Sequence, residues 1–215
     1  MANSVGSTSV RIVVLYLVLL VPVTSFAQLY GVPVSGVGNN IDVLSPDREW
    51  SVSIKANREN LPTLTIRKVS GGRSEELIGV LRSGWVLWSP ESRAFAFTDA
   101  AFADHYLLHL CSIESTATQC RDDSPELERR VKKTLPANAE IDRLYLKALR
   151  WQSPSMLVVG VHAVISEVKP GQTRVPVHYL FSAFSVSAKT GRIIKELTKK
   201  RARFELGESL DQLEW

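Results

Sequence analysis

The chain has 215 residues, a formal net charge of +4 at pH 7 and a hydrophobic fraction of 45%. This length suits one ordinary domain with an apolar core. The small positive charge does not indicate a surface for nucleic acid, so no nucleic-acid partner is expected.

The first 27 residues are laid out like a secretory signal peptide. A polar start carrying Arg11 precedes the apolar run 12–23, and Ser25 and Ala27 stand at the −3 and −1 positions of a cleavage site. The apolar run is shorter than the roughly 20 residues that a membrane-spanning helix needs. We therefore expect a signal peptide at 1–27 and a secreted or periplasmic mature chain without a stable membrane span. An uncleaved N-terminal anchor is the alternative.

The mature chain is expected to begin with an arm and to continue as strands. Residues 28–40 contain three glycines and a proline without apolar periodicity, which predicts an extended N-terminal arm. From residue 41 onward apolar and polar residues alternate, as in Trp50, Val52 and Ile54, and this period of two predicts half-buried strands. The expected strands are 50–55, 63–67, 77–81, 85–88, 94–97, 106–110, 144–151, 157–165, 175–186 and 192–197. Both faces of 94–97 are apolar, so this strand is expected to be buried on both sides.

One segment has a helical period instead. Leu127, Val131 and Leu135 lie four residues apart, Pro125 suits the first helical turn, and Pro136 ends the run. These features predict a short amphipathic helical insert at about 125–135 within a β domain spanning 41–198. The basic clusters 129–133 and 199–203 are interpreted as solvated faces, and 199–215 is expected to be a polar C-terminal tail.

Cys111 and Cys120 are the two cysteines of the chain, and they bracket a polar stretch. Disulfides form and persist outside the cytoplasm, so export favours a bond between them. The alternative is two free thiols. The spacing is not the C-x-x-C of a metal site.

A short pattern recurs near the starts of three predicted strands. It reads LSPDREWSV at 44–52, WSPESRAFAF at 88–97 and, in degenerate form, WQSPSMLVV at 151–159. The pattern resembles the W-S-P-D-G-K repeat of TolB-like β-propellers, which are relatives of the WD-type propellers. In that family the Pro-Asp-Gly step makes a tight turn; here Arg48 and Ser92 stand where the family has glycine.

The resemblance implies a mainly β fold, an antiparallel meander forming a propeller-like open arc of about three four-stranded blades. Closed propellers usually have four to eight blades. An open arc leaves sheet edges that must be covered, charged or paired. The expected partners are therefore a protein or peptide, or a second copy in a homo-oligomer formed through sheet edges.

The candidate binding surface consists of Trp85, Trp88, Asp99 and Asp104. Tryptophans near strand starts can stack on sugars or peptides, or can pack between blades. Asp99 and Asp104 flank the short loop 100–103, where two carboxylates can perform acid–base chemistry or simply end a turn. No catalytic, metal-binding or cofactor-binding residues are predicted. The sequence thus favours an exported, non-catalytic protein-binding or scaffold module, with a hydrolase or carbohydrate-active enzyme that has a dispersed site as the alternative.

Overall fold

The computed structural model describes residues 31–35, 41–167 and 175–207. The predicted signal peptide, 1–27, lies outside these residues. The helices are α1 (Ser124–Lys132) and α2 (Lys199–Leu206). The strands are β1 (Val32–Ser35), β2 (Val43–Leu44), β3 (Trp50–Ala56), β4 (Pro62–Lys68), β5 (Ser74–Gly79), β6 (Ser83–Trp88), β7 (Ala94–Asp99), β8 (His105–Ile113), β9 (Thr118–Asp122), β10 (Ala139–Ser153), β11 (Met156–Glu167), β12 (Val175–Ser187) and β13 (Ile193–Leu197).

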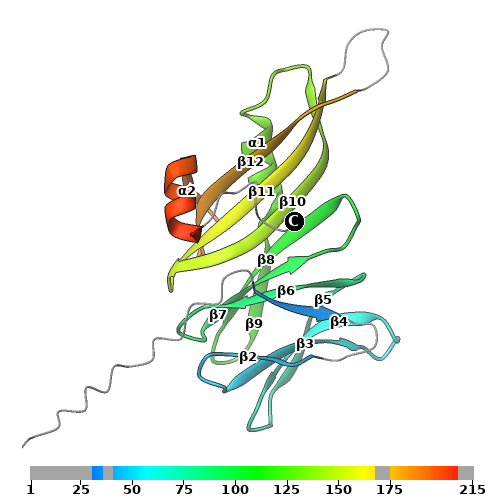
Figure 1. Cartoon of the computed structure of the whole chain (residues 1–215). Coiled ribbons are helices and arrows are strands. Elements are labelled where there is room, and N and C mark those ends of the chain that lie inside the picture. The colour runs from blue at the N-terminus through cyan, green and yellow to red at the C-terminus, as the bar shows by residue number, and fades with distance from the viewer. Residues whose placement is uncertain (1–30, 36–40, 168–174, 208–215) are drawn as a thin grey trace, which may run out of the picture.

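The strands form two open sheets, which confirms the predicted mainly β fold. Strands β2, β3, β4 and β5 make a four-stranded antiparallel sheet in chain order. The other nine strands make a second sheet in the order β1-β6-β7-β8-β10-β11-β12-β13, with β9 paired to β8. Figure 1 shows the small sheet at one end of the molecule and the long strands β10, β11 and β12 at the other.

The second sheet departs from the expected meander at two junctions, β1 with β6 and β8 with β10. Strand β10 pairs with β8 in parallel, through Leu144 opposite His105 and Tyr145 opposite Tyr106. Between β8 and β10 the chain forms β9 and α1. The buried side chains of Leu127 and Val131 attach α1 to the core. This crossover joins the later strands to β8, so they do not form two further separate four-stranded sheets.

Three apolar clusters stabilise the fold: two lie on the opposite faces of β6 and β7, and the third lies between α2 and the large sheet. The small sheet packs through Ile54 and Leu64 onto one face of β6 and β7, where Phe95 and Phe97 are fully buried. The opposite face of β6, β7 and β8 packs on α1 and on β10, β11 and β12. Strand β7 is therefore buried on both sides, as its sequence predicts.

The two helix predictions need correction at their ends. Helix α1 ends at Lys132 rather than at 135, because the chain tightens into turns in which Thr134 N donates to Val131 O and Leu135 N to Lys132 O. Residues 199–206, predicted as polar tail, form α2. Thr198 caps the N-terminus of α2, and its side chain accepts a hydrogen bond from Arg201 N. The helix buries Ala202 and Leu206 against the sheet. Part of the predicted arm, Val32–Ser35, is strand β1 paired with β6.

The first two copies of the repeated pattern fold into matching turns. We call residues 45–48 the first turn and residues 89–92 the second turn. Arg48 N donates to Ser45 O at 2.8 Å, and Ser92 N donates to Ser89 O at 3.0 Å. Arg48 has φ 61° and Ser92 has φ 58°, the left-handed conformation that glycine adopts most readily. The backbone of these turns thus keeps the conformation of a glycine turn without the glycine.

Two buried tryptophans make matching links to the preceding copy. Trp88, at the start of the second copy, donates from Nε1 to Val43 O at 3.2 Å, just before the first copy. Trp151, at the start of the third, donates from Nε1 to Leu87 O at 3.1 Å, just before the second. Each indole N–H therefore donates to a backbone carbonyl just before the preceding copy of the pattern.

Candidate functional site

The four residues of the predicted binding surface do not come together. Trp88 and Asp99 are 5% and 3% exposed, so the assignment of both to a surface is wrong: each faces the core between the two sheets. Trp85 is half-buried on the other face of β6. Asp104 is exposed in the loop before β8 and lies 3.6 Å from Nδ1 of His105.

The predicted disulfide is present. Cys111 and Cys120 are bonded across the β8–β9 hairpin, where they occupy directly opposite positions. Cys111 also packs in the core between the sheets. The bond therefore holds β9 and the hairpin tip in place on the rim of the molecule.

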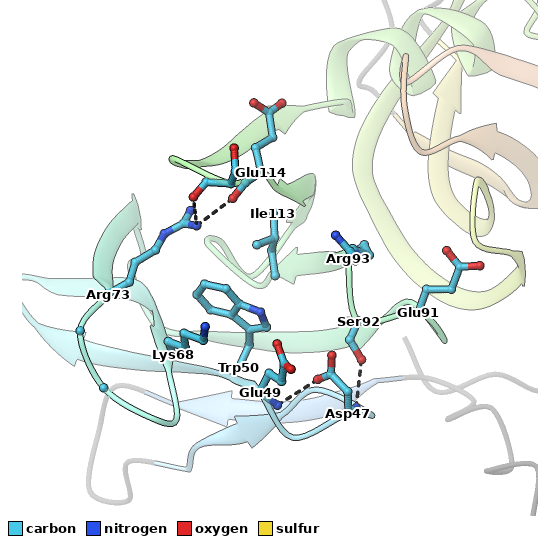
Figure 2. A pocket seen from close by; sticks show the side chains of 13 residues that line it. Asp47, Glu49, Trp50, Lys68, Arg73, Glu91, Ser92, Arg93, Ile113 and Glu114 are labelled. Carbon is cyan, nitrogen blue, oxygen red and sulfur yellow. Dashed lines mark hydrogen bonds between the residues drawn. The ribbon is translucent and has the colours of Figure 1, made fainter.

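Near this hairpin lies a cavity that we call the charged groove. It has a volume of about 640 Å³ and lies between the small sheet and the second turn. Figure 2 shows Trp50 near its centre, with Lys68 and Arg73 on one side and Glu91 and Arg93 on the other. The groove is lined by Asp47, Glu49, Trp50, Lys68, Gly71, Gly72, Arg73, Glu91, Ser92, Arg93, Ile113, Glu114 and Ser115.

The floor of the charged groove is built by contact between the two matching turns. Asp47 N donates to Ser92 Oγ at 3.0 Å (Figure 2). The Asp47 carboxylate accepts from Ser45 Oγ at 2.6 Å and from Glu49 N at 2.9 Å. Burial alone would raise the pKa of Asp47, but these hydrogen bonds outweigh it and hold the pKa below its usual value. The hydrogen bonds of Asp47 thus favour the charged carboxylate and suit a structural acceptor better than a general acid.

Arg73 fixes one wall of the groove. Its guanidinium donates to Glu114 O at 2.8 Å and to Thr118 Oγ1 at 3.1 Å, and it pairs with Glu75. The same group lies 5.0 Å from the centre of the Trp50 ring. Hydrogen bonding from Arg73, the largest influence, lowers the pKa of Glu75. This clasp ties the small sheet to the β8–β9 hairpin and orients the indole.

Four other charged side chains of the groove are uncommitted. Glu49, Lys68, Glu91 and Arg93 have no side-chain hydrogen bond or ion pair to any described residue. Two are acidic and two basic, and they stand around a half-buried tryptophan. Such a set can form ion pairs and stacking contacts with an external ligand.

A second groove occupies the equivalent place between the second and third copies of the pattern. Its volume is about 510 Å³, and Ala94, Pro154 and Ser155 contribute to its lining. Pro154 and Ser155 belong to the third copy. The two grooves therefore follow the spacing of the repeated pattern along the rim.

Aromatic side chains also cross the second sheet in a row. Tyr106, Tyr145, His162 and Phe181 occupy directly paired positions on β8, β10, β11 and β12, with successive ring centres 4.9, 5.2 and 4.6 Å apart. Trp85 continues the row, 5.5 Å from Tyr106. Burial, with Tyr145 as a smaller influence, raises the pKa of Tyr106. The row depends on the parallel β8–β10 pair, and the sequence pattern missed it for that reason.

The acid–base candidates of the sequence do not assemble into a catalytic group. Asp99 and His109 are buried, whereas Asp104 is exposed in the loop before β8 and His105 is the partly exposed first residue of that strand. Burial lowers the pKa of His109, an effect that Asp122 and Asp123 partly offset. Within the described ranges, no three histidine, cysteine or acidic side chains gather as they would around a metal ion.

The repeated pattern was a usable signal for the charged groove, because its first two turns form the floor. The sequence of the β4–β5 turn, with Lys68 and Arg73, has no pattern that predicts its contribution to the groove.

Comparison with protein-family models, curated proteins and solved structures finds no match. Neither of the two described helices has the length and apolar character needed to cross a membrane.

Proposed function

We propose that this protein is an exported, non-catalytic protein-binding module, built from about three degenerate units related to TolB-like and WD-type propeller repeats. Its binding site is the charged groove between the first two units, and its ligand is an extended polar segment of a protein partner. The supporting observation is the set of two acids and two bases that surround Trp50 without partners of their own among the described residues.

The matching contacts between layers support the proposed repeat relationship. Trp88 and Trp151 each donate to a backbone carbonyl just before the preceding copy, and the first two turns have the same hydrogen bonds. Contacts that recur with the sequence pattern are expected when each unit packs only on its neighbours. Grooves at equivalent places between units then follow from the repetition.

The disulfide supports an extracytoplasmic location, since such bonds persist in oxidising compartments. Export is tested by the mass of the protein recovered from its native cell. We expect the mature chain to begin at Gln28, after cleavage behind Ala27. A recovered chain that still carries residues 1–27 contradicts cleavage.

The hydrolase alternative receives less support from the geometry. General acid–base catalysis needs two titratable groups within hydrogen-bonding reach of one substrate. Asp47, one hydrogen-bonded carboxylate of the charged groove, has a lowered pKa, and Asp99, whose pKa is raised, does not line that groove.

The proposal is tested by photo-cross-linking in the native cell. A benzophenone amino acid is placed at Glu91, an exposed position of the groove, and in a separate variant at Glu59, an exposed position in the β3–β4 turn outside it. We expect a discrete protein adduct from position 91 and none from position 59. Equal adducts from both positions, or none from position 91, would remove the support for a protein ligand in the groove.

A further inference from the structure

Strand β13 is an edge strand of the large sheet and lies beside a helix. Among the described strands it pairs only with β12 and stands last in the order of the large sheet. Its outward backbone groups are therefore available to another extended chain. Natural edges are often protected by charged residues, and β13 carries exposed Lys195 and Glu196, but its second residue, the apolar Ile194, is also 56% exposed.

A groove runs between this edge and α1. It has a volume of about 220 Å³ and is lined by Glu126, Arg129, Arg130 and Lys133 of α1 and by Ile193, Ile194, Lys195 and Glu196 of β13. We call it the edge groove. The helix reaches this position because Leu127 and Val131 bury their side chains in the core, which turns the basic side of α1 toward β13.

The charges of the edge groove are unbalanced. Glu126 pairs with Arg129, which neutralises one cation at the groove. Arg130 and Lys133 are exposed and have no ion pair with any described residue. Outside the groove the same helix pairs Lys132 with Glu128, at 2.7 Å. The unpaired cations of α1 in this segment therefore face the groove, and Lys195 of β13 adds a third. With Arg129 the groove has four basic side chains against two acidic ones, Glu126 and Glu196, so basic charge prevails.

We propose that the edge groove binds an extended acidic peptide, which adds to β13 as a further strand of the sheet. Backbone hydrogen bonds between the peptide and the edge of β13 set the register of the added strand, as in other cases of strand addition. Apolar side chains on one side of the peptide contact Ile194, and its carboxylates pair with Arg130 and Lys133. This site is separate from the charged groove and does not depend on the function proposed for it.

The first test is binding of a fluorescent, blocked peptide of alternating glutamate and valine to the purified full chain. A lysine–valine peptide of the same length is the matched control. We expect the acidic peptide to bind, with an affinity that falls as salt is added, and the basic peptide not to bind. Failure of the acidic peptide to bind at low salt overturns the proposal.

Neighbouring helix variants test the position of the site. Lys133→Glu and Arg130→Glu each change one groove charge by the same amount, and each is expected to weaken acidic-peptide binding roughly fivefold or more. Lys132→Glu makes the same change one position away, outside the groove, and is expected to alter affinity less than about twofold. Equal weakening by Lys132→Glu and Lys133→Glu overturns the assignment, because it indicates general attraction to a basic helix.

N-methylated peptides separate strand addition from charge attraction alone. Methyl groups on alternate backbone nitrogens block one hydrogen-bonding edge of an extended peptide and leave the other free. We expect one phase of methylation to abolish binding and the opposite phase to preserve it. Binding that survives both phases overturns strand addition, as does concentration-dependent dimerisation that the peptide does not reverse, since a second copy then occupies the edge.

Discussion

Replacing Asp99 should change how stability depends on pH. Asp99 ends strand β7 on the same side as Phe95 and Phe97, in the core between the sheets, and is 3% exposed. Its Oδ1 atom has no hydrogen-bond partner among the described residues. Burial raises the pKa of this carboxyl to about 6 from an ordinary value of 3.8.

The sign of the effect follows from proton binding. Between pH 3.8 and about 6 the folded chain holds the Asp99 proton while the unfolded chain releases it. The free energy of unfolding therefore falls as pH rises through this window, and the loss is complete above it. A difference of about two pKa units corresponds to about 3 kcal/mol.

Asp99→Asn supplies a neutral side chain of the same shape. Relative to the unaltered protein, we expect little difference in stability near pH 4 and a gain of up to about 3 kcal/mol near pH 8. Urea unfolding followed by tryptophan fluorescence at several pH values measures this difference. The lowered pKa values of His109 and His162 act in both proteins and cancel in the comparison.

Asp104→Asn is the matched control, because Asp104 is an exposed aspartate at the other end of the same loop. It should leave the pH profile of stability unchanged within about 0.5 kcal/mol. A stability difference for Asp99→Asn that is constant across pH, or a loss at pH 8, would refute the reasoning.

Three further substitutions test other parts of the structure. Replacing Cys111 and Cys120 together by serine should lower the free energy of unfolding by about 2–3 kcal/mol, the value for a short closed loop, and added reductant should then have no further effect on urea unfolding. Trp151→Phe should cost about 1–3 kcal/mol in the same assay, because the hydrogen bond from the buried indole N–H to the Leu87 carbonyl is lost; an unchanged midpoint would contradict this link between units. Arg48→Gly should raise stability by about 0.5–1 kcal/mol by relieving the left-handed backbone, and a lower melting temperature would count against the turn geometry.

Most of the strands could be predicted from the sequence because they have a local period of two, whereas β1, β2 and β9 lie outside the predicted strands. Trp50, Val52 and Ile54 alternate along β3, and the apolar segment 94–97 on both faces of β7 signalled a strand covered on two sides. No local sequence pattern predicts the parallel pairing of β10 with β8. It arises from the packing of α1 on the core, a contact between residues far apart in the sequence.

The candidate sites were predictable only in part, for the same reason. The repeated pattern located the turns that carry Asp47 and Ser92, but not the hydrogen bond that joins them. Asp99 offered a missed signal, since it alternates in step with Phe95 and Phe97 and so points into the core rather than to a surface. The sequence predicts the basic cluster of α1 to be a solvated face, and its proximity to β13 depends on tertiary packing.

The partner recovered by cross-linking at position 91 allows the central claim to be measured as an affinity. Arg93→Glu reverses the charge of a groove side chain that has no ion pair with any described residue, and Arg58→Glu makes the same change at an exposed site in the β3–β4 turn. We expect Arg93→Glu to weaken partner binding roughly tenfold and Arg58→Glu to leave it within about twofold. Equal affinities for the unaltered protein and Arg93→Glu would contradict the claim that this groove is the binding site.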